Sequence, residues 1–385
     1  MRIGIDARFL THPQVGGFKT YSENLIAALA RIDTENEYIL YLDRPADTQA
    51  KLPELPNFNN RVVPGLLPVI GMPWREQVGL ARQVSKDKVD LLHSPSLTAP
   101  LRLSCPLVVT IHDMIWLFPE KFSRAKSRSI QRKLMEWYYR FVPKSAAQHA
   151  STILTVSQAA KESIVQHLGV TPEQVLVTHE AASSIYRRVD DITKIEAIRS
   201  KYHLTTEFIL AIGSADPRKN LSRLVQAYAL LPITVRERYK LVIVWTHHLL
   251  AADLAEQIKK LELDNQVQFV KQVSNEDLVL LYNAASLFVF PSLYEGFGLP
   301  LLEAMACGTP VIAANNSSIP EIVGDAALLF EAEDVNTLAG VMDQVLMDQS
   351  LQQCLAQKGL ERANNFSWEK CAHQTLLGYQ QALLN

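Results

Sequence analysis

The sequence predicts an α/β protein of two doubly wound parallel-sheet domains that face each other across a cleft. Short apolar runs alternate with longer stretches of helical periodicity from one end of the chain to the other, which is typical of parallel strands joined by crossover helices. This alternation starts again after a charged, irregular stretch, residues 186–202, that we interpret as a linker. The length of 385 residues fits this division, because one domain usually takes roughly 150 residues.

Apolar runs give the predicted strands of each domain. Those of the first domain cover residues 2–8, 38–42, 61–64, 90–93, 106–112, 152–156 and 174–178. Those of the second domain cover residues 208–213, 240–244, 266–270, 287–290, 310–314 and 327–330. We therefore expect domains over residues 1–187 and 188–367, followed by a helix over residues 368–385 with no strand after it.

The composition is that of a soluble globular protein, with 48% hydrophobic and 20% charged residues. A net charge of -2 gives no reason to expect nucleic acid as a partner. No apolar run reaches the roughly 18 residues that a membrane span takes. The amino terminus has the pattern of a strand rather than of a signal peptide. The four cysteines lie far apart, as expected for reduced thiols of a cytoplasmic protein.

Residues 291–303 form the most informative stretch of the chain. They join the predicted strand 287–290 to a helix that Pro300 can open and Gly308 can close. Glu295 lies in the loop beyond the carboxyl end of this strand, where open α/β sheets bind ligands. Glu303 lies in the first turns of the helix, whose amino end favours anions. The stretch therefore predicts a site for a phosphorylated ligand.

Two glycine-containing loops suggest further contacts with an anion. Gly16 and Gly17 precede a helix, so their backbone can approach a ligand closely, although a plain turn would explain them as well. In the second domain, Arg218 and Lys219 follow the strand that ends at Gly213. Their fixed charge can offset that of a diphosphate, most usefully when it becomes a leaving group. A basic helix start at the surface is the alternative, but cations are disfavoured at a helix amino end.

Two histidines and a basic segment complete the candidates in the first domain. His112 ends a predicted strand and can bond to a sugar hydroxyl or a phosphate, or it can be a structural histidine. His93 ends the preceding strand in the same way and is predicted to form a wall of the cleft. Residues 121–144 interleave basic and aromatic side chains. They can rest on anionic lipid headgroups or receive an acidic acceptor, or they form a solvated face.

The run from Phe290 to Ile312 resembles the signature of the retaining family-four glycosyltransferases, nucleotide-sugar enzymes with the type-B fold of two Rossmann-like domains. Glu295 and Glu303 are separated by seven residues, with the glycines, prolines and apolar residues of the motif in place. The resemblance covers nearly the whole chain. It also includes Gly16-Gly17, His112-Asp113, Ser157, residues 217–220, Pro320-Glu321 and residues 366–368.

This resemblance implies a role for each candidate. Glu303 would bind the ribose hydroxyls of the donor nucleotide. Glu295 would lie beside the donor sugar, and the amides of residues 297–299 (Phe297, Gly298 and Leu299) would hold sugar hydroxyls and phosphate.

The remaining roles concern the leaving group and the reacting carbon. Lys219, helped by Arg218, would stabilise the departing diphosphate, and Gly17 with Gly16 would meet this diphosphate from across the cleft. His112 would contact the donor sugar near the reacting carbon. Glu295, Lys219 and His112 are thus the expected catalytic residues, and the last helix is expected to cross back to the first domain.

The implied reaction transfers a sugar, with retained anomeric configuration, from a nucleotide diphosphate to a glycan, lipid-linked or polysaccharide acceptor. The resemblance is to mannosyltransferase-like group 1 enzymes, whose first domain binds the acceptor. We expect no metal ion, because the sequence has no Asp-x-Asp triplet and Lys219 with helix amino ends can stabilise the leaving group. We expect no cofactor besides the nucleotide-sugar donor.

Several positions depart from the family pattern. Ser214 stands where an arginine or threonine is usual, and Trp245 and Lys271 stand near positions where glycines commonly end strands. Residues 178–181 replace a commoner asparagine-glycine turn. The preference for the nucleotide base therefore stays open. Two other functions also remain: a degenerate nucleotide-sugar-binding subunit that assists a partner glycosyltransferase, and a sugar-nucleotide epimerase.

Overall fold

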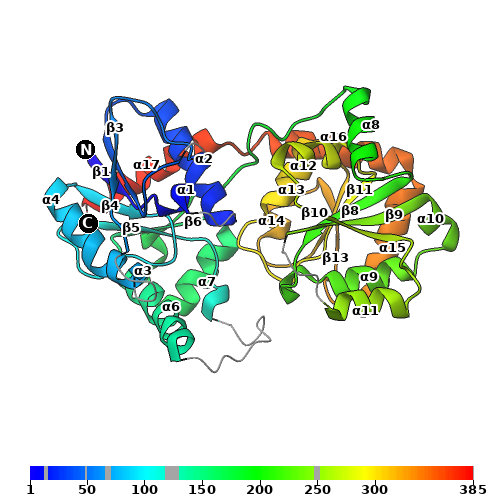
Figure 1. The fold of residues 1–385 in the computed structure, drawn as a ribbon, viewed down its shortest axis with the longest axis horizontal. Helices are drawn as coiled ribbons and strands as arrows, with labels where there is room; N and C mark the ends of the chain where they lie inside the picture. Colours follow the sequence, from blue (N-terminus) through cyan, green and yellow to red (C-terminus); the bar gives the residue numbers. More distant parts are fainter. Residues whose placement is uncertain (13–15, 48–49, 66–70, 118–129, 247–251, 385) are drawn as a thin grey trace. The chain divides into compact units, whose positions relative to one another are not determined.

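The computed structural model describes residues 1–12, 16–47, 50–65, 71–117, 130–246 and 252–384 (Figure 1). Their contacts divide the chain into two compact units. Unit 1 contains the described residues up to 180 together with residues 367–384, and unit 2 contains the described residues from 181 to 366. Each unit has its own parallel sheet with helices packed around it.

The sheet of unit 1 has seven parallel strands in the order β3-β2-β1-β4-β5-β6-β7. The strands are β1 (Arg2–Ile5), β2 (Glu37–Leu42), β3 (Phe58–Val62), β4 (Leu91–Ser94), β5 (Leu107–Ile111), β6 (Thr152–Thr155) and β7 (Val175–Val177). The chain runs outward from β1 to β3 and then returns to place β4 on the other side of β1. Ligands bind at such a switch point in open α/β sheets, so the loops after β1 and β4 are candidates.

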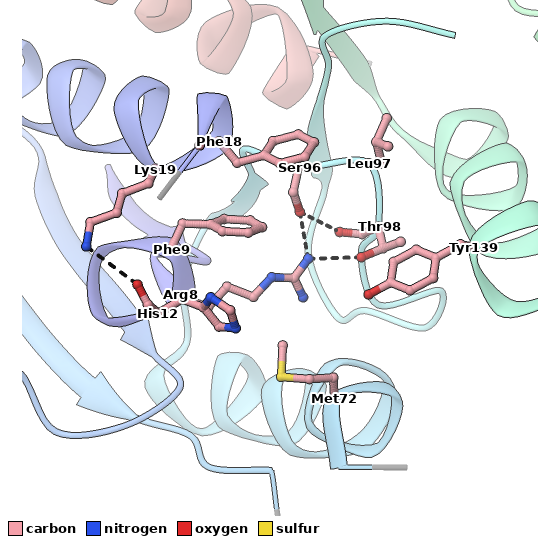
Figure 2. A pocket seen from close by; sticks show the side chains of 11 residues that line it. Arg8, Phe9, His12, Phe18, Lys19, Met72, Ser96, Leu97, Thr98 and Tyr139 are labelled. Carbon is pink, nitrogen blue, oxygen red and sulfur yellow. Dashed lines mark hydrogen bonds between the residues drawn. The ribbon is translucent and has the colours of Figure 1, made fainter. Parts of the chain in front are cut away.

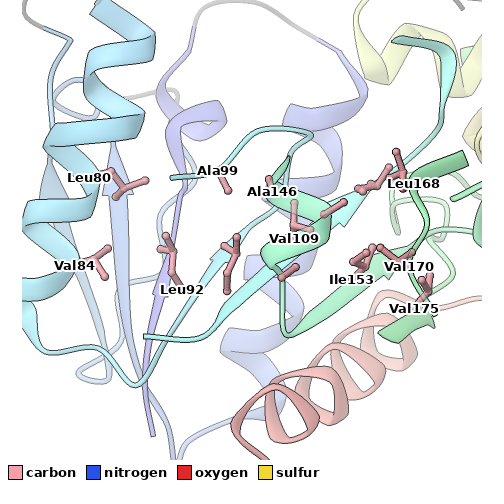
Figure 3. Packing of buried hydrophobic residues seen from close by; sticks show 14 of the residues in the cluster. Leu80, Val84, Leu92, Ala99, Val109, Ala146, Ile153, Leu168, Val170 and Val175 are labelled. Atoms are coloured by element: carbon pink, nitrogen blue, oxygen red, sulfur yellow. The ribbon is translucent and has the colours of Figure 1, made fainter. Parts of the chain in front are cut away.

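The helices of unit 1 cover both faces of this sheet. Those formed by described residues are α1 (Arg8–Thr11), α2 (Gly17–Ile32), α3 (Gly71–Trp74), the π-helix η1 (Arg75–Leu80), α4 (Ala81–Asp87), η2 (Ile115–Leu117), α6 (Ile130–His149), α7 (Gln158–Leu168), η3 (Pro172–Gln174) and α17 (Trp368–Leu384). On one face, Leu80 and Val84 belong to the same buried apolar cluster as the strand residues Leu92, Val109 and Ile153 (Figure 3).

The last helix, α17, belongs to unit 1 and packs against α2 and the strands β4 to β7. Gly378 allows this close approach, because a Cβ there would lie 2.7 Å from Cδ2 of Leu154. At the next residue, the hydroxyl of buried Tyr379 lies 2.7 Å from Nδ1 of His93. The carboxyl-terminal helix is therefore part of the unit 1 core.

The sheet of unit 2 has six parallel strands in the order β10-β9-β8-β11-β12-β13, with the same switch between the first and fourth strands. The strands are β8 (Glu207–Gly213), β9 (Tyr239–Trp245), β10 (Val267–Lys271), β11 (Leu287–Phe290), β12 (Val311–Ala314) and β13 (Ala327–Phe330). The helices are α8 (Ile192–Lys201), η4 (Pro217–Lys219), α9 (Leu221–Ala229), α10 (Ile233–Arg238), α11 (Ala252–Lys260), α12 (Asn275–Ala284), α13 (Leu299–Ala306), α14 (Ile319–Val323), α15 (Val335–Met347) and α16 (Gln349–Ala363).

The predicted strands all occur, with small shifts at their ends. The interpretation of residues 186–202 as an irregular linker is wrong, because they contain helix α8. Its start is set by Asp191, whose carboxylate accepts hydrogen bonds from the N–H groups of Thr193 and Lys194. Only Ile198 of this helix is buried, so the sequence shows little apolar periodicity there.

The structure also groups residues 181–187 with unit 2, whereas the sequence analysis placed them in the first domain. Two contacts explain this grouping. The rings of Tyr186 and Tyr282 lie 6.0 Å apart, and the side-chain amide of Asn283 donates a hydrogen bond to the carbonyl of Arg187 at 3.0 Å.

Candidate functional site

The switch point of unit 2 brings together the loops that follow β8 and β11. Nζ of Lys219, from the first loop, lies 2.6 Å from Oε1 of Glu295, from the second. The N–H of Leu293 donates to the carbonyl of Arg218 at 2.7 Å. The buried side chain of Asn220 donates to the carbonyl of Pro291 at 3.0 Å. Strand order thus makes neighbours of two segments that are far apart in the sequence.

The two basic residues of the first loop have different surroundings. The carboxylate of Asp216 caps the short helix η4 and bonds to the guanidinium of Arg218 at 2.7 and 2.9 Å. Lys219 is paired with Glu295, and its Nζ also lies 5.6 Å from the ring centre of Phe290. The side chains of Lys219 and Glu295 are only 23% and 13% exposed. An anion that binds here would compete with Glu295 for the ammonium group.

The loop that carries Glu295 is held in place by two serines that follow β12. The N–H of Glu295 donates to Oγ of Ser317 at 3.0 Å. Oγ of the buried Ser318 lies 3.0 Å from the carbonyl oxygen of Glu295 and 2.9 Å from that of Phe297. The sequence analysis missed both serines. Their position after a strand at the same sheet edge was the signal that could have revealed them.

Helix α13 begins as the sequence predicted. Leu299 and Pro300 are its first residues, and Gly308 follows its end with a φ of +76°. Gly298 precedes the helix with a φ of +107°, a conformation that favours glycine. The first N–H groups of a helix have no carbonyl partner within it, so this end favours an anion.

Glu303 lies in the second turn of α13, between two tyrosines. The hydroxyl of Tyr282 donates to its Oε2 at 3.1 Å, and the hydroxyl of Tyr186 also bonds to this carboxylate. Burial, and then the charge of Glu303, raises the pKa of Tyr282 well above its ordinary value. Burial followed by the same charge raises the pKa of Cys307 to about 12. The two hydroxyls thus hold the carboxylate of Glu303 in place.

In unit 1, His112 is paired with Glu180. Its Nδ1 lies 3.1 Å from Oε1 of Glu180, and the two side chains are 15% and 6% exposed. The rings of Tyr21 and Phe18 approach the imidazole edge-on, with centres at 4.6 and 5.2 Å. Sequence reasoning found His112 but missed Glu180, which follows β7 at the same edge of the sheet.

His93 was expected from the sequence to form a wall of the cleft, but in the structure it does not. It is fully buried and bonds to Tyr379 at 2.7 Å and to Thr110 at 2.8 Å. Burial lowers the pKa of His93 to about 3. It is therefore a neutral histidine of the core.

Gly16 and Gly17 stand at the start of α2, with Gly17 as the first helical residue. Gly16 has an extended φ of 165°, which any residue can adopt. Among the described residues, no heavy atom lies within 4 Å of the position that a Cβ would take at either glycine. Neither the backbone conformation nor close packing requires glycine at these two positions. The interpretation of the pair as part of a plain turn is therefore weaker than that of a ligand contact.

A cavity of about 280 Å³ lies at the switch point of unit 1, between the loops that follow β1 and β4 (Figure 2). Its walls are formed by Arg8, Phe9, His12, Gly16, Phe18, Lys19, Met72, Ser96, Leu97, Thr98 and Tyr139. The rings of Phe9 and Phe18 are stacked, with centres 5.2 Å apart. Figure 2 shows the Arg8 guanidinium bonded to Ser96 and Thr98, at 2.7 and 2.9 Å.

Arg8 belongs to a buried cluster of two arginines and two carboxylates. Arg8 bonds to Glu76 at 2.6 Å, and Arg75 bonds to Asp6 at 2.8 Å. Burial disfavours the ionised form of Asp6 and acts to raise its pKa. The neighbouring guanidinium groups of Arg75 and Arg8 outweigh this effect, so the pKa of Asp6 is lowered. The charges cancel, so this wall of the cavity is polar without being an anion site. The sequence analysis missed the cluster, because Arg75 and Glu76 come from the π-helix η1, far from β1 in the chain.

The structure describes only part of the basic and aromatic segment, residues 121–144. Residues 121–129 lie outside the described residues. On α6, Tyr138 donates to Glu76 at 2.5 Å, and Tyr139 lines the cavity. Trp137 and Phe141 are more than half exposed, and their rings stack with centres 5.3 Å apart. Arg140 and Lys144 are also exposed.

Within the described part of the chain there is neither a membrane-spanning helix nor a metal-binding cluster. In residues 1–384 apart from the gaps given above, no helix is long and apolar enough to cross a membrane. Within the same ranges, no three His, Cys, Asp or Glu side chains converge as a metal site would require.

Solved structures of known function show the same fold. Sucrose-phosphate synthase from Thermosynechococcus elongatus matches with a TM-score of 0.75 over 99% of this chain and 98% of its own, at 22% identity. WaaG, a glycosyltransferase involved in lipopolysaccharide biosynthesis, matches with a TM-score of 0.73 over 97% of this chain and 98% of its own, at 18% identity. The two parallel-sheet units thus define the type-B glycosyltransferase fold.

Sequence relatives identify the family. The model described as Glycosyltransferase Family 4 matches residues 15–181, and Glycosyl transferases group 1 matches residues 194–362. O-antigen chain mannosyltransferase B of Escherichia coli is 35% identical over 292 residues, which cover 75% of this chain and 74% of the relative. The chain therefore belongs to the group 1 glycosyltransferases of family four.

A second relative is much longer than this chain. The serotype-specific mannosyltransferase WbdA of Escherichia coli is 33% identical over 242 residues, which cover 61% of this chain and 29% of the relative.

Proposed function

We propose that this glycosyltransferase transfers a hexosyl group, with retention of anomeric configuration and without a metal ion, from a nucleotide-diphosphate sugar to a glycan or lipid-linked acceptor. The observation that carries the proposal is the contact of 2.6 Å between Lys219 and Glu295 at the switch point of the unit 2 sheet. It joins a fixed cation to a carboxylate beside the amino end of α13, where a diphosphate and a sugar can be held together.

The reaction breaks the bond between the sugar and the diphosphate. Negative charge grows on the diphosphate, and cationic character grows at the sugar. Lys219 and the first amides of α13 stabilise the former charge, because the loops that carry them are already joined by hydrogen bonds. Glu295 lies beside the sugar and orients it. Glu303, held by Tyr282 and Tyr186, accepts hydrogen bonds from the ribose hydroxyls.

In unit 1, Gly16 and Gly17 are assigned to the donor diphosphate, and His112 to the donor sugar. No other described residue packs where a Cβ of either glycine would lie, which supports close approach of a ligand. The cavity beside Arg8 is assigned to the acceptor. Its stacked Phe9 and Phe18 rings offer an apolar surface, and the neutral cluster behind Arg8 suits an uncharged sugar.

The transferred sugar is proposed to be mannose. Both curated relatives described above are mannosyltransferases, and the first is covered over 74% of its length. Its description as an O-antigen chain enzyme supports a bacterial polysaccharide as the acceptor. Thermal stabilisation by uridine, guanosine and adenosine diphosphates, measured side by side, would identify the base, because a ligand stabilises the state that binds it.

Contact with the inner membrane face is proposed for α6. Trp137, Arg140, Phe141 and Lys144 occupy positions i, i+3, i+4 and i+7, so they share one face of the helix. Such a face can insert its rings at an anionic lipid surface. Sedimentation with anionic vesicles at low and physiological salt tests this, with Trp137→Ala/Phe141→Ala as the variant. Absence of binding at both salt concentrations would refute it.

A nucleotide-sugar-binding subunit without activity of its own is the second candidate. Ser214, Trp245 and Lys271 motivate it, because these departures lie at the carboxyl edge of the unit 2 sheet. Trp245 is only 2% exposed and packs edge-on against Phe269, with ring centres 5.6 Å apart. The ring of Trp245 is therefore part of the core, which weakens its role in this second candidate.

Incubation of the purified chain with nucleotide-diphosphate sugars and bacterial glycan acceptors decides between the two candidates. Sugar transfer by the chain alone, lost in folded Lys219→Ala, supports the enzyme. Nucleotide binding with neither sugar transfer nor donor hydrolysis supports the nucleotide-sugar-binding subunit. Conversion of the donor without any acceptor would instead indicate an epimerase. The anomeric configuration of the product, read by nuclear magnetic resonance, tests retention.

A further inference from the structure

We propose that Glu180 is a positioning residue for His112: its carboxylate holds Nδ1 of the imidazole and thereby presents Nε2 to a hydroxyl of the donor sugar. This inference rests on the proposed function, in which His112 contacts that sugar. It extends the proposal to a residue at which this chain departs from the usual asparagine-glycine turn.

The contact determines which ring nitrogen carries the proton. A carboxylate accepts a hydrogen bond from Nδ1 only when Nδ1 is protonated. At 3.1 Å, Oε1 of Glu180 therefore holds a proton on Nδ1. In the neutral ring that carries this proton Nε2 is an acceptor, and a sugar hydroxyl can donate to it.

Nε2 is the group that lacks a partner. Within the described residues, this buried atom has no hydrogen-bond partner. A buried polar atom without a hydrogen bond destabilises the protein, so such an atom usually has a partner or a ligand. The rings of Tyr21 and Phe18 flank the imidazole edge-on and restrict its rotation. A hydroxyl that reaches Nε2 would supply the missing bond.

The backbone two residues before Glu180 is bonded to neighbouring elements of unit 1. The N–H of Thr178 donates to the carbonyl of Thr155 on β6 at 2.7 Å. The carbonyl of Thr178 lies 3.8 Å from Sγ of Cys371 on α17. Glu180 is only 4% exposed, and a buried carboxylate is costly unless it has a hydrogen-bond donor. Nδ1 of His112 supplies such a donor.

Steady-state kinetics of four variants test the inference. Glu180→Ala is expected to lower kcat about 100-fold, because a catalytic contact displaced by about 1 Å costs that much. Glu180→Gln keeps an oxygen that can accept from Nδ1 but loses the charge, so a loss of about tenfold is expected. His112→Ala and the double variant Glu180→Ala/His112→Ala should be equally slow, since Glu180 acts only through His112.

Nucleotide affinity provides the structural control. All variants should bind the nucleoside diphosphate as the wild type does, because Glu303 and Lys219 in unit 2 carry that binding. Glu173→Gln, an exposed change in the same segment of unit 1, should leave kcat unchanged.

The outcomes separate this inference from the proposed function. A wild-type chain without sugar transfer would refute the proposed function itself. An active wild type with full kcat in Glu180→Gln and Glu180→Ala would overturn the inference alone. Additive losses in the double variant would also overturn it, since they would show that Glu180 acts independently of His112. If Glu180→Ala does not fold, the near-isosteric Glu180→Gln decides.

Discussion

Replacement of Lys219 by methionine removes the cation of the proposed donor site and keeps most of the side-chain volume. Glu295 then loses its partner at 2.6 Å, and a bound diphosphate loses the ammonium that would stabilise it. Asn220, which joins the two loops through its bond to the Pro291 carbonyl, is unaffected. The change therefore tests charge with little disturbance of the loops.

The structure predicts a modest effect on stability and a large one on rate. The pair is neither exposed nor fully buried, at 23% and 13% exposure. Its loss should cost about 2 kcal/mol of unfolding free energy, between the values for exposed and buried pairs. A preorganised group that stabilises charge in the transition state contributes about 10²–10³ in kcat. Lys219→Met should therefore lower kcat by this factor.

Initial rates of sugar transfer over a range of donor concentrations provide the assay, and chemical denaturation provides the stability. Lys358→Met is the matched control. It breaks an ion pair of similar length, 2.8 Å, with Asp325, but these side chains are 43% and 83% exposed. The control should retain full kcat. A Lys219→Met enzyme with wild-type kcat would refute the assignment of Lys219 to the leaving group.

Three further predictions concern two glycines, the buried His93 and the requirement for a metal ion. Gly17→Ala should fold normally, because no other described residue packs where its Cβ would lie, and should lose transfer activity. Gly298→Ala should lose about 1–3 kcal/mol of stability, because its φ is +107°. Denaturation midpoints of both variants check this, and a destabilised Gly17→Ala would contradict it. His93 has a folded pKa of about 3, so the unfolded state binds more protons between that value and about 6.5. Stability should consequently fall as the pH is lowered through this window, and His93→Gln should flatten the dependence; an equally steep curve in the variant would contradict the reasoning. Activity should survive a chelator, and loss that magnesium or manganese reverses would refute metal independence.

Much of the fold could be predicted from the sequence, because buried parallel strands appear as short apolar runs. Helix α8 could not be predicted in this way, because Ile198 is its only buried residue and the sequence of the segment resembles that of a linker. The motif around Glu295 and Glu303 predicted the strand, loop and helix correctly, including the roles of Pro300 and Gly308 in bounding α13.

The contacts of the candidate site were harder to predict than its residues. The pairing of Lys219 with Glu295 depends on β8 and β11 being neighbours, which no local pattern shows. The bond between His112 and Glu180 and the cluster around Arg8 likewise join distant segments. Local chemistry marks the residues, whereas the order of strands decides which of them meet.

The most direct measurement of the central claim is the affinity of the wild type and of Glu303→Ala for a nucleoside diphosphate, determined by calorimetric titration. Glu333→Ala, an exposed change in the same unit, is the control. A hydrogen bond to a charged group contributes about 1.5–3 kcal/mol, so the affinity should fall roughly 10- to 100-fold in Glu303→Ala and stay unchanged in the control. Equal affinity of Glu303→Ala and the wild type would contradict the assignment of the nucleotide to helix α13.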